Sequence, residues 1–169
     1  MLQGDLLALT GKGSAIETIS SALAAIRSTG ATLFIPGRLS TLARAYADLG
    51  RFDDAWRSIG EAMTAADTTK ERWWDTEINR VAGEIALKQP DQDAAKAEEY
   101  FDRALSVARQ QQAKSWELRA AMSMARLWRD QGKVQQAREL LAPVYGWFTE
   151  GFDTIDLKEA KILLEGLVS

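Results

Sequence analysis

The chain has 169 residues, of which 46% are apolar and 27% charged, proportions that allow a packed core under an ordinary charged surface. Its net charge is −3, so it lacks the strong basic field typical of nucleic-acid-binding proteins, and we expect no nucleic-acid partner. It contains no cysteine and no histidine, which excludes disulfides, thiolate or imidazole metal sites, and Ser-His-Asp or Cys-His catalysis.

The sequence shows neither a membrane-spanning segment nor a secretory signal. No apolar run approaches the roughly 20 residues that a membrane-spanning helix needs. The N-terminal segment Met1–Asp5 has no basic residue of the kind that opens a secretory signal. We therefore expect a cytoplasmic protein with no membrane partner.

Apolar residues recur at spacings of three and four along the whole chain, which predicts an all-α protein. Four alanines mark a longer period, at intervals of 40 (15 to 55), 42 (55 to 97) and 40 residues (97 to 137). A bulky apolar residue follows each of them four positions later, at Ile19, Ile59, Phe101 and Leu141. A period near forty predicts stacked helix pairs rather than a single globular core.

The first unit, residues 1–30, is predicted to begin part-way through a first helix. A turn at Gly11–Ser14 then leads to a second helix, in which Ser14 and Glu17 form a capping box. Gly11–Ser14 also invites a phosphate-loop interpretation. That motif requires Gly-x4-Gly-Lys-Ser/Thr after a strand, and neither the spacing nor a strand is present. An interhelix turn is the preferred interpretation.

The next three units, at about 31–69, 70–112 and 113–150, each contain a first and a second helix. Within each unit the helices are expected to approach closely at small residues, and the marker alanine should lie at that contact. Gly50 and Gly132 are placed where a first helix should end in the left-handed conformation that glycine adopts freely. The small residues concerned are Ala43, Gly83, Ala125, Ala55, Ala97 and Ala137.

The end of the chain is predicted to differ from the repeats. Pro143 lies inside the last second helix and should kink it or split it near Ala142, because proline removes one intrahelical hydrogen bond. Residues 154–168 form one further helix without a partner, which we interpret as a cap over the last apolar face. The whole chain, 1–169, is thus one helical repeat domain.

The pattern resembles the tetratricopeptide (TPR) repeat, which carries Trp-x2-Leu-Gly-x2-Tyr on its first helix and Ala-x3-Phe-x2-Ala on its second. The copy closest to it is Leu42-Ala43-x2-Tyr46, Gly50 and Ala55-x3-Ile59-x2-Ala62. The first-helix tryptophan is absent, and the period is near 40 rather than 34. The resemblance implies a right-handed α-solenoid of about four TPR-like helix pairs, whose first helices line a concave groove.

The last third has a narrower resemblance. The segments Ala125–Gly132, Leu141–Thr154 and Asp156–Lys161 are similar to the helical tail of bacterial multidomain proteins that join cyclase-like or DNA-binding modules to a predicted ATPase. This resemblance implies a helical sensor or scaffold region of a signalling protein. It carries no catalytic activity over to these residues.

Acidic pairs are the remaining candidates for chemistry. Neighbouring acids at Asp53-Asp54 and Glu98-Glu99 point about 100° apart on a helix, so they do not converge as general acid–base catalysis requires. A magnesium site at Asp91 and Asp93 is conceivable, and a solvated loop is the simpler interpretation. We expect no enzyme activity, no metal and no cofactor.

Tryptophans Trp73, Trp74 and Trp116 recur at the starts of first helices, together with Phe34 in the first copy. Packing between repeats is one interpretation of them. The other is that Trp73 or Trp74 stays exposed and anchors a partner.

The first-helix face away from the core is the predicted binding groove. Its arginines outnumber its acids, and arginine suits bidentate recognition of carboxylates. The alternative is a solvated charged face with ion pairs inside each helix. The predicted groove residues are Arg44, Arg80, Glu84, Arg119, Met122, Arg126 and Arg129.

The sequence therefore predicts a non-catalytic scaffold or sensor that binds an acidic or C-terminal peptide of a partner protein. Two other functions stay open. One is a self-associating regulatory domain of a cyclase or ATPase system, dimerising through the open ends of the array. The other is a small-ligand-binding domain.

Overall fold

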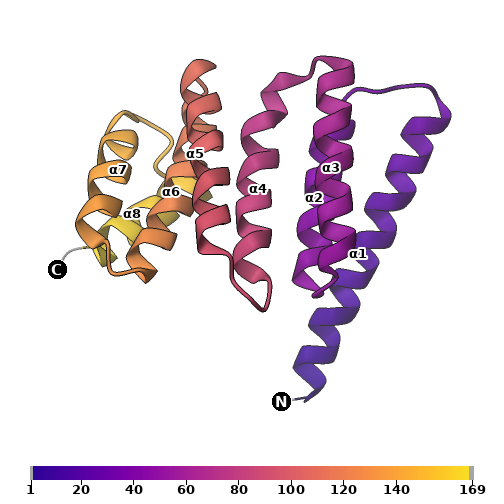
Figure 1. Cartoon of the computed structure of the whole chain (residues 1–169), viewed down its shortest axis with the longest axis horizontal. Coiled ribbons are helices and arrows are strands. Elements are labelled where there is room, and N and C mark those ends of the chain that lie inside the picture. Colours follow the sequence, from indigo (N-terminus) through magenta and orange to yellow (C-terminus); the bar gives the residue numbers. More distant parts are fainter. Residues whose placement is uncertain (1, 168–169) are drawn as a thin grey trace.

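The computed structural model describes residues 2–167, with side chains described from residue 13 onward, and these residues form an all-α domain. Eight α-helices pack as adjacent antiparallel pairs, and a short 3₁₀ turn precedes the fourth (Figure 1). The helices are α1 (Leu2–Ser28), α2 (Ile35–Asp48), α3 (Phe52–Thr69), η1 (Arg72–Trp74), α4 (Asp75–Lys88), α5 (Ala94–Gln110), α6 (Lys114–Asp130), α7 (Val134–Gly146) and α8 (Ile155–Gly166).

The two helices of each pair approach closely at the small residues that the sequence pattern predicted. Ala55, Ala97 and Ala137 are completely buried, as are Ala43 and Ala125 on the facing first helices. Gly83 is needed for the approach of α4 to α5, because a methyl group added to it would lie 2.5 Å from Phe101 Cε1. The marker residues of three units are therefore contact points between helices.

The glycine turns are also confirmed. Gly50 and Gly132 have φ angles of 73° and 78°, the left-handed conformation that closes a helix without strain from a Cβ atom. The amide of Gly50 donates to the carbonyl of Ala47, and the amide of Gly132 donates to that of Arg129.

The first unit differs from its prediction. Residues 2–28 form one continuous helix, so Gly11–Ser14 is neither an interhelix turn nor a phosphate loop, and Ser14 is not an N-cap. Ala15 is exposed, unlike the other three marker alanines, because no separate first helix packs on it. The N-terminal half of α1 instead extends past the ends of α2 and α3 (Figure 1).

The C-terminal prediction holds in part. Helix α7 continues through Pro143 to Gly146, so proline does not split it. Helix α8 packs on α6 and α7 through Leu157, Ala160 and Leu163, which are buried. It thus covers the last apolar face of the chain.

Candidate functional site

A groove follows the alternate helices α2, α4, α6 and α8, which contact one another in that order. It consists of two adjoining hollows that share Arg44, Glu77 and Arg119. One hollow, about 320 Å³ in volume, is lined by arginines and carboxylates, and we call it the ion-paired half. The other, about 480 Å³, is walled by Phe34, Trp74 and Trp116, and we call it the aromatic half.

Six of the seven predicted groove residues line the ion-paired half: Arg44, Arg80, Glu84, Arg119, Met122 and Arg126. Arg129 does not, and instead pairs with its neighbour Asp130 at 2.9 Å. Repeat spacing identified these positions correctly as one face of successive first helices. It did not reveal what faces them across the groove.

Arg80 is the centre of the ion-paired half and is buried, with 8% of its surface exposed. Its Nε and Nη2 each donate a 2.8 Å hydrogen bond to a different oxygen of Glu77, a bidentate pair, and its Nη1 donates to Glu84. Arg44 Nη2 reaches Glu77 Oε1 at 2.5 Å from α2. Arg80 is thus occupied within the protein and is not a free contact for a ligand.

Helix α8 supplies the acids that the sequence prediction missed. Arg119 Nε donates to Asp156 at 2.7 Å, and Arg126 Nη2 donates to Glu159 at 2.9 Å. With Glu77 and Glu84, four carboxylates balance the four arginines that line this half. The predicted excess of arginine is therefore absent here, and the pairs run mainly between helices.

These contacts change the titration of the buried groups. Burial of Glu77 would raise its pKa, but the hydrogen bonds from Arg80 and the charges of Arg80, Arg44 and Arg119 outweigh it, so the pKa is lowered. Burial would likewise lower the pKa of Arg80, and the hydrogen bonds and charges of Glu77 and Glu84 raise it instead. Both groups stay charged at neutral pH.

Trp74 is the central ring of the aromatic half. Its centroid lies 6.4 Å from that of Phe34 and 6.0 Å from that of Trp116, both in edge-to-face geometry. Gly37 admits the indole against α2, since a methyl group there would lie 2.6 Å from Trp74 Cζ2. The three rings come from three successive units and form one wall.

The cations of this half are less compensated than those of the other half. Arg119 lies over the Trp116 ring, with Cζ 5.1 Å from the centroid. Arg38 is exposed and forms no ion pair within the described part of the chain. Arg44 and Arg119 also line this hollow, but both are ion-paired, with Glu77 and Asp156, so Arg38 is its one uncompensated arginine among the described residues.

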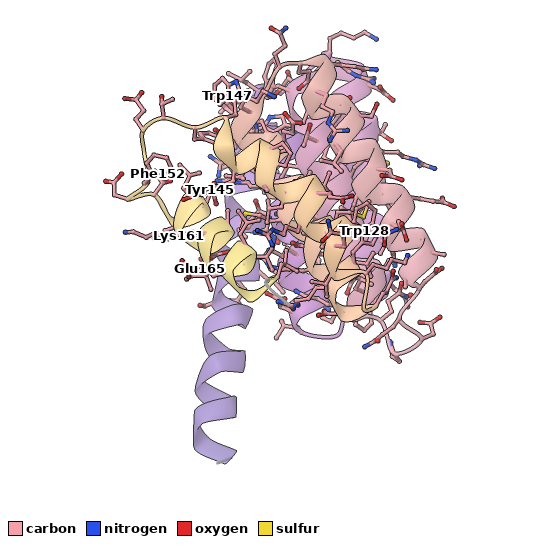
Figure 2. The ribbon with its side chains drawn as sticks, turned by 90° about the vertical axis from the view of Figure 1, so that its left-hand side faces the viewer. Trp128, Tyr145, Trp147, Phe152, Lys161 and Glu165 are labelled. Carbon is pink, nitrogen blue, oxygen red and sulfur yellow. The ribbon has the colours of Figure 1, made fainter. Side chains whose placement is uncertain are left out.

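The predicted aromatic anchors separate into two kinds. Trp74 and Trp116 pack against each other and also line the aromatic half. Trp73 is 46% exposed on η1 and lies outside both hollows. Exposed aromatics also occur at the far end of the domain, where Trp147 and Phe152 lie in the connection from α7 to α8 (Figure 2).

Phe34 has a backbone that sequence reasoning did not predict. Its φ angle is 65°, unusual for a bulky residue. Its amide donates a 2.9 Å hydrogen bond to Oε2 of Glu71, which is 3% exposed. The partners lie 37 residues apart in the chain, so only the folded domain brings them together.

Two of the other acidic candidates, Asp93 and Asp54, have local structural roles. Asp93 caps α5 by accepting a hydrogen bond from the Lys96 amide, and Asp54 pairs with Arg51 at 2.5 Å and with Arg57. Among the side chains of residues 13–167, no group of three or more acids could hold a metal ion.

No protein-family model matches this chain, and no curated protein matches it either. None of the described helices is both long and apolar enough to span a membrane. The residues of the groove are therefore the basis for inferring function.

Proposed function

We propose that this chain is a non-catalytic protein-interaction module, a right-handed solenoid of TPR-like helix pairs that binds a peptide segment of a partner in its groove. The observation that carries the proposal is the groove itself. Alternate helices of successive units line it without interruption, and half-exposed aromatic rings lie beside arginines along it. Aromatic and arginine side chains dominate the binding energy of protein interfaces.

The neighbour relationships of the helices support the solenoid. Each second helix contacts the first helix of its own unit and that of the next: α3 contacts α2 and α4, α5 contacts α4 and α6, and α7 contacts α6 and α8. Contacts confined to neighbouring units are typical of repeat arrays, and their curvature creates extended concave surfaces.

The chemistry of the groove favours binding over catalysis. A general acid or base must exchange protons near the working pH. Glu77 has a lowered pKa, and the other lining acids are each held by an arginine, Glu84 by Arg80, Asp156 by Arg119 and Glu159 by Arg126. These ion pairs hold the arginine side chains in place along the groove.

A peptide-display selection on the intact chain tests the function, followed by titration calorimetry of the selected peptides. Trp116→Ala should weaken their binding by about tenfold or more, because a hot-spot aromatic anchor contributes roughly 2 kcal/mol or more and every ~1.4 kcal/mol is a factor of ten. Trp147→Ala is the matched control, since Trp147 is exposed outside the groove. A selection that yields no binders, or binders indifferent to Trp116, would overturn the proposal.

Self-association is a second candidate, favoured by the shape of α1. Its N-terminal half extends beyond the body of the domain (Figure 2), and a hollow of about 500 Å³ lies where α1, α2 and α3 meet, lined by Ile35, Leu39 and Ala65 among others. A second copy could bind this end of the array. Light scattering across a hundredfold range of concentration separates a monomeric adaptor from a homodimer.

The resemblance of the last third to signalling tails adds a proposed setting for either function. In a bacterial cyclase or ATPase system, a module of this kind would recruit or sense a cytoplasmic partner. Its own residues would then supply the contact and not the chemistry.

A further inference from the structure

We propose that the aromatic half of the groove is the anchor subsite for an apolar, preferably aromatic, side chain that lies next to an Asp or Glu side chain in the partner's peptide. The inference rests on the proposed function and names the ligand chemistry of one part of the same groove. It is supported by three features of the aromatic half: the exposed ring of Phe34, which a left-handed backbone holds in place (the constrained display), a preformed wall of rings, and an arginine without a carboxylate partner.

The constrained display concerns Phe34, which is 49% exposed at the start of α2. A left-handed backbone is unfavourable for a bulky residue, so other contacts must maintain it. Glu71 does so by accepting the Phe34 amide hydrogen from a buried position at the junction of α3 and η1. The strained backbone thus keeps an apolar ring at the mouth of the hollow.

The ring wall is already in place without a ligand. Trp74 is held between Phe34 and Trp116 and rests on the Gly37 backbone. The hollow in front of it measures about 480 Å³, within the roughly 300–1,000 Å³ common for small-ligand pockets, and thus has room for an aromatic side chain. A preformed aromatic wall lowers the ordering cost of binding, so it favours an apolar side chain.

The positive charge lining the aromatic half indicates that the peptide residue next to the apolar side chain is acidic. Arg38 projects from the rim with no carboxylate partner among residues 13–167, and Arg119 is held over Trp116 by Asp156. The charges of the ion-paired half cancel, so a preference for an acidic peptide residue must arise from Arg38 in the aromatic half. Because the hollow continues into the ion-paired half, a chain can pass through, and an internal Asp or Glu is favoured over a chain terminus.

The test uses four acetylated and amidated hexapeptides that combine Phe or Ala with a neighbouring Asp or Asn. The Phe–Asp peptide should bind at least tenfold more tightly than either single replacement, measured by calorimetry and by tryptophan fluorescence. Trp116→Ala should reduce the preference for Phe, whereas Arg38→Gln should reduce only the preference for Asp. Trp147→Ala should change neither preference.

Phe34→Asn separates the ring from the backbone that carries it. Asparagine tolerates the left-handed conformation, so the thermal midpoint of unfolding should be unchanged or higher while the Phe–Asp peptide binds at least fivefold more weakly. A variant that loses binding and stability together would contradict the display role of Phe34.

Three results would overturn the inference. The first is equal affinity for the four peptides. The second is an unamidated Phe–Asn peptide that binds as tightly as Phe–Asp, which would assign Arg38 to a C-terminal carboxylate. The third is that binding of the selected peptides depends on Arg126 but not on Trp116 or Arg38. The chain would then still bind peptides, but at the ion-paired half of the groove. Failure of every displayed peptide to bind would overturn the proposed function as well.

Discussion

Gly83 on α4 and Phe101 on α5 meet so closely that the hydrogen of the glycine is all that the ring leaves room for. A methyl group at Gly83 would lie 2.5 Å from Phe101 Cε1 and 2.7 Å from Cδ1. Phe101 is itself buried among the apolar residues of the C-terminal core, so the ring cannot turn into solvent. This contact sets how closely α4 and α5 approach.

Gly83→Ala is therefore expected to destabilise the domain by roughly 1–3 kcal/mol through overpacking, measured by urea unfolding. Gly60→Ala is the control, because Gly60 is exposed within α3 and has no atom within 4 Å of the added methyl group. There alanine should stabilise the helix by roughly 0.5–1 kcal/mol. Equal effects at the two glycines would contradict the contact.

The marker alanines yield a second matched pair. Ala97→Leu should destabilise the domain by roughly 1–3 kcal/mol, because Ala97 is completely buried between α4 and α5. Ala15→Leu should change the unfolding free energy by less than about 0.5 kcal/mol, since Ala15 is exposed on α1. Thermal melts of both variants measure the difference, and a stable Ala97→Leu variant would refute the tight contact.

The pair shows what repeat spacing can and cannot predict. Spacing identified Ala55, Ala97 and Ala137 as buried because small residues at the period of the repeat record a close helix contact. It failed at Ala15 because α1 continues through Gly11–Ser14, where propensity alone favours a turn. Each glycine in a helix interior costs only about 1 kcal/mol, so Gly11 and Gly13 are not enough to end this helix.

The groove shows the same division. The sequence spacing correctly predicted that Arg80, Arg119 and Arg126 share one face, because the helical period determines which residues lie on the same side. It could not predict Asp156 and Glu159, because the position of α8 depends on how the last pair packs. The Phe34–Glu71 hydrogen bond is similarly non-local and has no sequence signature.

Removal of Glu77 should have a large effect. Glu77→Ala leaves the buried Arg80 with Glu84 as its remaining carboxylate, and loss of one partner of a buried ion pair costs roughly 3–5 kcal/mol. Arg126→Ala is the comparison, because the Arg126–Glu159 pair is partly exposed and such pairs contribute roughly 0–1 kcal/mol. Equal losses of unfolding free energy in the two variants, measured in urea, would show that Arg80 is exposed to solvent rather than buried.

The contribution of Glu77 should also depend on pH. Its pKa in the folded protein is lower than the ordinary 4.5, so the stabilisation is complete above 4.5 and is lost as the pH falls through the folded value. The difference in unfolding free energy between the wild-type chain and Glu77→Gln should therefore shrink below pH 4.5. A difference that stays constant from pH 6 to pH 3 would show that Glu77 has an unshifted pKa.

Pro143 gives a prediction of the opposite sign. Helix α7 continues through this exposed proline, which lacks the amide hydrogen that an interior helical residue donates. Pro143→Ala should restore that hydrogen bond and raise the unfolding free energy by about 1–3 kcal/mol. Pro90→Ala in the exposed connection from α4 to α5 should instead lower it by about 0.4–1 kcal/mol, because proline there restricts the unfolded chain. Urea unfolding of the two variants measures both signs, and a loss of stability in Pro143→Ala would mean that the proline is required for the packing of α7 against α6 and α8.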